Sequence, residues 1–289
     1  MSIPNSDTAM DDGWHAPASV GGCYTALCRS NHHLTLCHGA AARAVKELVP
    51  GGIVATGVNI AAFYPLNNEP KNVEAYRHCE EDQTFWYLDP IFKGGGYPEA
   101  ALKRAYDHGD DFFVKKGDDE LMHANTDIVG FNHYFSIWVE SGDTHTYQGW
   151  NYGKPPEGLE KNSWDSVVYP QGFYDCFKQL SERYKGFPQM ITENGLPEPT
   201  DKVSDDGRVH DTGRVEYIKK YVGAMKRALN DGVDIRGYMF WSFMDNFGWA
   251  EGYHMRFGLV HTDLKTLKRT IKDSGYCYQE IIASKGAHL

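Results

Sequence analysis

Residues 189–195 (Gln-Met-Ile-Thr-Glu-Asn-Gly) constrain this chain most, because an apolar, β-favouring run stops there at a carboxylate and a turn-forming pair. A strand that ends in this way directs Glu193 to the edge of a sheet. A second run of the same kind, residues 237–241, ends at an aromatic side chain, Trp241. Taken singly, Glu193 could be a helix cap or a surface acid, and Trp241 a core residue. Taken together, the two strand ends are expected to face one pocket.

Other apolar runs divide the chain into predicted strands and helices. Strands are expected at 53–60, 127–132, 189–192 and 235–241, where β-branched and aromatic residues cluster. Helices are expected at 24–49, 72–88, 171–184, 213–230 and 268–284. The first helix carries His32, His33 and His38 at spacings that cannot converge on one ion. We therefore predict no metal site.

The net charge of the protein argues against two classes of binding partner. The 289 residues carry a net charge of -10 and show no basic patch, which argues against nucleic acid or an anionic membrane as a partner. No apolar run reaches the roughly 18 residues of a membrane span, and the N-terminus lacks the pattern of a signal peptide. The cysteines are scattered without CxxC spacing, which favours free thiols in a reducing compartment. We expect a cytoplasmic protein with a disordered tail at 1–12 and one domain at 13–289.

Seven motifs, in order along the chain, resemble those of glycoside hydrolase family 1, the retaining β-glucosidases and their relatives. They lie at residues 13–17, 127–134, 169–170, 192–195, 241–253, 256–259 and 268–270. The resemblance implies an α/β fold, the (β/α)8 TIM barrel, with the active site at the C-terminal ends of the strands. It covers only the C-terminal half of that barrel, about strands 5 to 8. The segment that carries the family's acid/base Asn-Glu-Pro motif would lie upstream of residue 13.

The same resemblance implies roles for individual residues. Glu193 would be the catalytic nucleophile, and the Tyr134 hydroxyl would donate a hydrogen bond that orients Glu193 and favours its ionised form. Tyr134 could instead be a buried core residue whose hydroxyl is satisfied elsewhere. The implied sugar contacts are Asn132, Trp241, Trp249 and Phe257. No cofactor is implied.

Two positions complicate the resemblance. Gly248 stands where the family has a glutamate that binds the distal hydroxyls of the sugar, and glycine cannot accept those hydrogen bonds. Asn68-Glu69-Pro70 imitates the acid/base motif, but it follows residues 13–17 in the chain, whereas the family's acid/base precedes that segment. We therefore predict a structural role for Glu69, just before a proline in the first turn of a helix.

Residues 137–168 are rich in Gly, Asn, Trp and Tyr and have no clear periodicity, so a long surface loop near the pocket mouth is predicted. Trp150 and Trp164 could stack on a sugar there or merely fill the loop.

A retaining glycosidase needs two carboxyl groups about 5 Å apart, and the sequence identifies only Glu193. The first hypothesis is a retaining β-glycosidase that hydrolyses a β-glycoside or oligosaccharide with a complementing segment as the source of the acid/base. The second is a catalytically inactive, truncated or degenerate relative that binds sugar or has a structural role. A third makes Glu69 a relocated acid. Because a half-barrel leaves two sheet edges unpaired, a homodimer or a complementing half-barrel chain is expected as partner.

Overall fold

A four-stranded parallel sheet forms the centre of the computed structural model, which describes residues 24–107, 114–142, 149–199, 201–249 and 252–289. Its strands lie in the order β1 (Val58–Asn59), β3 (Val129–Asn132), β6 (Gln189–Asn194) and β7 (Ile235–Phe240). The four predicted strand segments are thus confirmed as parallel neighbours. The first is shorter than expected, since outside β1 it contributes only a bridge from Ala55 to Ile128. Within the described residues these strands do not close into a barrel.

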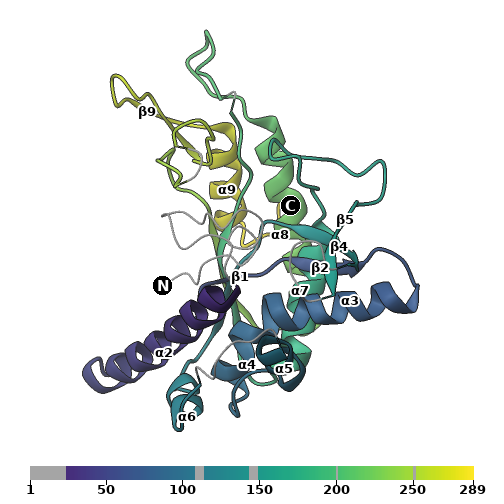
Figure 1. The fold of residues 1–289 in the computed structure, drawn as a ribbon. Coiled ribbons are helices and arrows are strands. Elements are labelled where there is room, and N and C mark those ends of the chain that lie inside the picture. The colour runs from purple at the N-terminus through teal and green to yellow at the C-terminus, as the bar shows by residue number, and fades with distance from the viewer. Residues whose placement is uncertain (1–23, 108–113, 143–148, 200, 250–251) are drawn as a thin grey trace.

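Helices from the second half of the chain cover one face of this sheet (Figure 1). They are α7 (Pro170–Arg183), α8 (Thr212–Asn230) and α9 (Asp273–Ala283). α8 packs between α7 and α9. Val58, Phe131 and Ile191 stand in register on neighbouring strands and bury their side chains in one core with apolar residues of α7 and α8. This packing leaves the carboxyl ends of the strands, where Asn132 and Glu193 lie, outside that core.

The remaining helices come from the first half of the chain. They are α2 (Tyr24–Leu48), α3 (Pro70–Glu80), the π-helical η1 (Glu81–Phe85), α4 (Trp86–Phe92), α5 (Glu99–Asp107) and α6 (Asp118–Met122). α2 projects to one side of the molecule with α6 packed against it (Figure 1). The helices predicted at 24–49 and 72–88 are confirmed, although η1 interrupts the second.

The prediction of a long surface loop at 137–168 is wrong for 137–141 and 150–153, whereas 154–168 form a loop with one bridge from Lys161 to Val167. β4 (Ser136–Ser141) and β5 (Trp150–Gly153) pair antiparallel there, and β2 (Ala62–Pro65) adds to β4 in parallel to complete a second sheet. Trp150 is 1% exposed, and its indole N–H donates to Asp82 Oδ2 at 3.0 Å, so this ring fills the interior. The pairing partner β2 is remote in the sequence, and no local periodicity reveals it.

The last predicted helix is also too long. β9 (Arg269–Ile271) pairs antiparallel with β8 (Val260–Thr262), and α9 begins only at Asp273. The helices predicted at 171–184 and 213–230 agree with α7 and α8 to within a residue at each end.

Two sequence predictions cannot be compared with the fold. The tail predicted at 1–12 and the motif at 13–17 lie outside the described residues.

None of the described helices is both long and apolar enough to cross a bilayer. No disulfide joins the five cysteines that the structure describes.

Candidate active site

Glu193 and Tyr134 meet at the carboxyl edge of the central sheet. Glu193 is the penultimate residue of β6, and Tyr134 lies just beyond the end of the neighbouring strand β3. Tyr134 Oη donates a hydrogen bond of 3.0 Å to Glu193 Oε2. Asn132, the last residue of β3, accepts a hydrogen bond of 2.6 Å from the Thr192 hydroxyl and is also hydrogen-bonded to the Glu193 carboxylate. Three of the predicted site residues therefore form one cluster.

A break in strand register brings Glu193 beside Asn132. Phe131 pairs with Ile191, but the next pair is Asn132 with Glu193, so β6 carries one extra residue at this point. A bulge of this kind redirects the side chains at the end of a strand. In regular pairing Thr192 would stand opposite Asn132, and the following side chain would point to the other face. The bulge thus places Glu193 opposite Asn132, while the Thr192 hydroxyl still donates to the Asn132 side chain.

The surroundings of Glu193 control its protonation. Burial raises the pKa of Glu193 above its ordinary value, while the hydrogen bonds from Tyr134 and Asn132 act in the opposite direction. Burial and the negative charge of Glu193 raise the pKa of Tyr134 well above its ordinary value, so its hydroxyl stays protonated and donates. No charged group of the described residues contributes to the shift at Glu193. The carboxylate is oriented and partly desolvated, which suits a nucleophile.

Asn194 is a residue that the sequence analysis treated only as part of a turn. Its fully buried amide donates to His133 O at 2.6 Å and to Tyr217 Oη at 2.8 Å, and it accepts from Tyr238 Oη at 2.8 Å. Its backbone carbonyl accepts from Trp241 N–H at 2.9 Å. One side chain therefore ties the ends of β3, β6 and β7 to α8 and holds Glu193 in place. The only sequence signal for this role is a polar residue directly after a predicted strand.

Gly195 allows the chain to pass close to β7. A Cβ atom at this position would lie 2.0 Å from Trp241 O, a separation that real structures do not permit. Glycine is required here for the close approach of two backbones rather than for the predicted turn. The contact joins the chain after Glu193 to the strand that ends at Trp241.

The predicted aromatic contacts are brought together only in part. The Phe257 ring lies 5.1 Å from the Trp164 ring, which in turn stands edge-on to Tyr134 at 6.1 Å. Trp241, at the end of β7, is 38% exposed. Trp249 is 75% exposed and follows Gly248, which exchanges two backbone hydrogen bonds with Gly252. Phe257 thus reaches the cluster through Trp164, a residue for which the sequence left stacking and filling open, whereas Trp249 stands apart.

Glu69 lies at the start of a helix, as the sequence predicts. It is the exposed residue before α3, with Pro70 in the first turn, and its carboxylate pairs with Lys71 at 3.2 Å. Asn67 also hydrogen-bonds the Glu69 side chain. Its position at the start of α3 and its ion pair with Lys71 fit the structural role that the sequence predicts.

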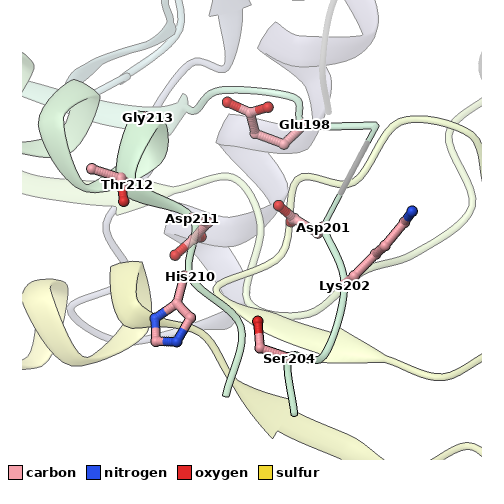
Figure 2. Close-up of a pocket in the computed structure, with 8 residues that line it drawn as sticks. All are labelled: Glu198, Asp201, Lys202, Ser204, His210, Asp211, Thr212 and Gly213. Atoms are coloured by element: carbon pink, nitrogen blue, oxygen red, sulfur yellow. The ribbon is translucent and has the colours of Figure 1, made fainter. Parts of the chain in front are cut away.

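A polar pocket of about 370 Å³ opens beside the start of α8 (Figure 2). Glu198, Asp201 and Ser204 line it from the loop after β6, and His210 and Asp211 from the residues before α8. None of the predicted site residues lines this pocket. Among the described residues no group of three or more His, Cys, Asp and Glu side chains is arranged to hold a metal ion. The pocket is therefore separate from the Glu193 cluster and has no metal-binding geometry.

Comparison with known proteins gives the family. A sequence profile of glycosyl hydrolase family 1 matches residues 4–287. β-Glucosidase A of Acetivibrio thermocellus is 35% identical over 275 residues, which cover 95% of this chain and 60% of that protein. β-Glucosidase A of Thermotoga maritima is 34% identical with the same coverage.

The structural comparison agrees. The family 1 β-glucosidase structure from Thermotoga maritima aligns with a TM-score of 0.89 at 31% identity, over 100% of this chain and 64% of that chain. The chain therefore spans about 60% of the length of the curated relatives named here. Since the profile, the relatives and the solved structure all match nearly its whole length, this chain belongs to glycosyl hydrolase family 1.

Proposed function

We propose that this chain supplies the nucleophile of a retaining β-glycosidase of the β-glucosidase type, with Glu193 as the attacking carboxylate. The observation that carries the proposal is the 3.0 Å hydrogen bond from Tyr134 Oη to Glu193 Oε2 at the carboxyl edge of a parallel sheet. Active sites of barrel enzymes lie at this edge. The bond restrains the rotamer of the carboxylate and favours the ionised form that attacks an anomeric carbon.

The proposed substrate is a β-glycoside or oligosaccharide held by Asn132, Trp241, Trp249 and Phe257. Asn132 is supported by its hydrogen bond to Glu193, and Phe257 by its contact with Trp164 beside Tyr134. Trp241 presents a partly exposed ring at the end of β7, where it can stack on a sugar. Gly248 supplies no acceptor for distal hydroxyls, so the choice of sugar rests on the other contacts.

We propose further that β1, β3, β6 and β7 are about strands 5 to 8 of the family's barrel, because they are parallel neighbours in chain order. Among the residues that the structure describes, β1 and β7 are then the two edge strands of the sheet. Met239 and Phe243, on and after β7, are 52% and 70% exposed. Unpaired strands and exposed apolar side chains favour association with a complementing half-barrel chain or a second copy, the former also being the source of the acid/base.

A covalent label tests the nucleophile directly. An aryl 2-deoxy-2-fluoro-β-glucoside with a good leaving group can glycosylate a carboxylate without help from an acid/base. We expect one adduct per chain, located by peptide mass spectrometry on the fragment that contains Glu193. Glu193→Gln should remain unlabelled, and the control Glu69→Gln should label like the parent. A folded parent that takes no label, or takes it on another carboxylate, would contradict the proposal.

A non-catalytic, sugar-binding or structural role is the second candidate. It is favoured by Gly248, which supplies no acceptor for the distal hydroxyls of a sugar at a position where the family has a glutamate. Glycoside hydrolysis separates the two candidates. An enzyme that lacks only the acid/base should still cleave an aryl glycoside with a good leaving group but not an alkyl glycoside. A binding protein should cleave neither while it still binds glucono-lactone in calorimetry.

A further inference from the structure

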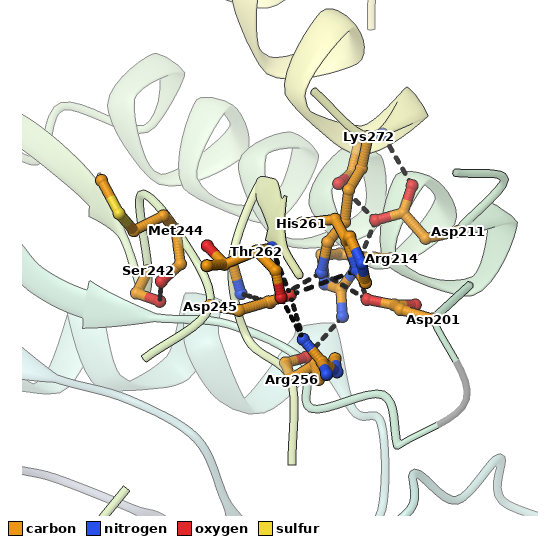
Figure 3. A network of polar contacts seen from close by, with 12 residues as sticks. Asp201, Asp211, Arg214, Ser242, Met244, Asp245, Arg256, His261, Thr262 and Lys272 are labelled. Atoms are coloured by element: carbon orange, nitrogen blue, oxygen red, sulfur yellow. Dashed lines mark hydrogen bonds and ion pairs between the residues drawn. The ribbon is translucent and has the colours of Figure 1, made fainter. Parts of the chain in front are cut away.

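A buried ionic network joins the loop between β7 and β8 to α8 and to the residue before α9 (Figure 3). Its members are the carboxylates of Asp201, Asp211 and Asp245 and the cations of Arg214, Arg256 and Lys272. The side chains of Arg214, Lys272 and Asp211 have no exposed surface, and those of Asp245 and Asp201 are 3% and 5% exposed. Charges so deeply buried are tolerated only when they are paired and hydrogen-bonded. The proposed chemistry of Glu193 uses none of them.

Asp245 makes the contacts that reach the proposed site. Its Oδ1 accepts from Lys272 Nζ at 2.9 Å and from Gly258 N–H at 3.0 Å. Its Oδ2 accepts from Arg256 Nη1 at 3.0 Å and from Thr262 N–H at 3.3 Å. Burial favours the neutral form of Asp245, but the charge of Lys272 and these hydrogen bonds prevail and hold its pKa below the ordinary value.

These bonds enclose Phe257. The residue before it, Arg256, is held through its side chain, and the residue after it, Gly258, through its backbone N–H. A Cβ atom at Gly258 would lie 2.1 Å from the backbone nitrogen of Asp245, so the two segments touch directly. Phe257 O accepts a hydrogen bond of 3.2 Å from Ser242 N–H, next to Trp241. Trp241 and Phe257 therefore both belong to backbone segments that the hydrogen bonds of Asp245 hold together.

We infer that Asp245 is a positioning residue for the sugar-contacting aromatics Trp241 and Phe257, with Lys272 as its buried counter-ion. The sugar part of this inference rests on the proposed function, whereas the anchoring of the segment 256–262 does not. Asp245 touches no substrate in this role and acts through the backbone on either side of Phe257.

Asp211 offers a matched control. Its carboxylate belongs to the same network and is equally buried, but it accepts from Arg214, from the Ser274 hydroxyl and from Ser274 N–H at 2.9 Å. These contacts join α8 to α9, and Asp211 reaches the segment around Phe257 only indirectly, through Arg214, whose guanidinium donates to Arg256 O at 2.6 Å. Asp245→Asn and Asp211→Asn each remove one negative charge from the network. A purely electrostatic or stabilising role therefore predicts similar consequences for both variants.

Amide hydrogen exchange under native conditions separates positioning from stability. We expect the peptide 256–262 to exchange at least tenfold faster in Asp245→Asn than in the parent, because the amides of Gly258 and Thr262 lose charged acceptors. The same peptide should change much less in Asp211→Asn, because Asp211 accepts from none of its amides and reaches it only through the bond from Arg214 to Arg256 O. If Asp245→Asn does not fold, Asp245→Asn/Lys272→Met removes one charge of each sign and keeps the network balanced. Unchanged exchange of this peptide in the Asp245 variant that folds would overturn the inference.

Sugar binding gives the second measurement. Glucono-lactone titrated by calorimetry should bind at least fivefold more weakly to the folded Asp245 variant than to the parent, with Asp211→Asn within twofold of the parent. Equal affinity of the Asp245 variant and the parent would also overturn the inference. A parent that binds no lactone would count against the proposed function alone, since the exchange experiment still decides whether Asp245 anchors the segment.

Discussion

Replacing Tyr134 with Phe removes one hydroxyl from the site and nothing else. In the parent that hydroxyl donates to Glu193 Oε2 at 3.0 Å, in a partly desolvated position with no cation nearby among the described groups. A hydrogen bond to a charged group contributes about 1.5 to 3 kcal/mol. If most of that energy orients the attacking carboxylate, its loss lowers the rate of glycosylation about tenfold to a hundredfold, at 1.36 kcal/mol per factor of ten.

The pH dependence of the same variant has a definite sign. Burial already raises the pKa of Glu193, and the bond from Tyr134 opposes that shift. Without the bond the pKa rises further, so a larger fraction of Glu193 is protonated and inactive at mildly acidic pH. The acid limb of the rate profile should therefore move to higher pH in Tyr134→Phe.

The assay is the rate of covalent labelling by the activated 2-fluoroglucoside between pH 4 and pH 8, followed by intact mass. Tyr64→Phe is the matched control, because the Tyr64 hydroxyl also donates to a carboxylate, that of Asp175, outside the Glu193 cluster. The control should label at the parent's rate and with its pH profile. If Tyr134→Phe labels as fast as the control and with the same acid limb, the hydrogen bond does not prepare Glu193 and the proposed role of Tyr134 is wrong.

Three further variants test single positions. Glu69→Gln should leave any aryl-glycosidase activity within a few-fold, because Glu69 is an exposed residue before α3; a large loss that added azide restores would identify it as an acid/base after all. Gly248→Glu should strengthen glucono-lactone binding about tenfold in calorimetry, because one charge-assisted hydrogen bond contributes about 1.5 kcal/mol. A folded variant with unchanged affinity would show that position 248 does not face the sugar. Gly195→Ala should lower the free energy of unfolding in urea by more than about 1 kcal/mol, because its Cβ would lie 2.0 Å from Trp241 O. Gly223→Ala, with open space at its Cβ inside α8, should be stabilising instead, and equal effects of the two alanines would refute this reasoning.

Much of the architecture follows from local sequence. The segments that became β3, β6 and β7 are recognisable because short apolar runs with β-branched or aromatic residues end at polar ones, and this signal is contained within each run. α7 and α8 are recognisable because apolar side chains recur at helical spacing. Glu193 could be singled out for a related reason, as a carboxylate placed directly at a strand end.

Other features depend on partners that are distant in sequence. The second sheet exists because β4 pairs with β2, and Trp150 is buried because Asp82 accepts its indole N–H. Local periodicity records neither interaction, so a loop was the natural prediction for 137–168. The helix predicted at 268–284 was too long for the same reason, since β9 is a strand only through its pairing with β8.

The sequence by itself indicated which residues to propose for the site, because the identity of a carboxylate or an aromatic ring at a strand end is a local property. Only the tertiary structure decided how they are used. The bulge in β6 places Glu193 opposite Asn132, and the hydrogen bond from Tyr134 exists because two strands lie side by side. The anchoring by Asn194 and Asp245 likewise joins segments far apart along the chain. Such contacts form only after the core has packed, since packing supplies the free energy that brings the segments together.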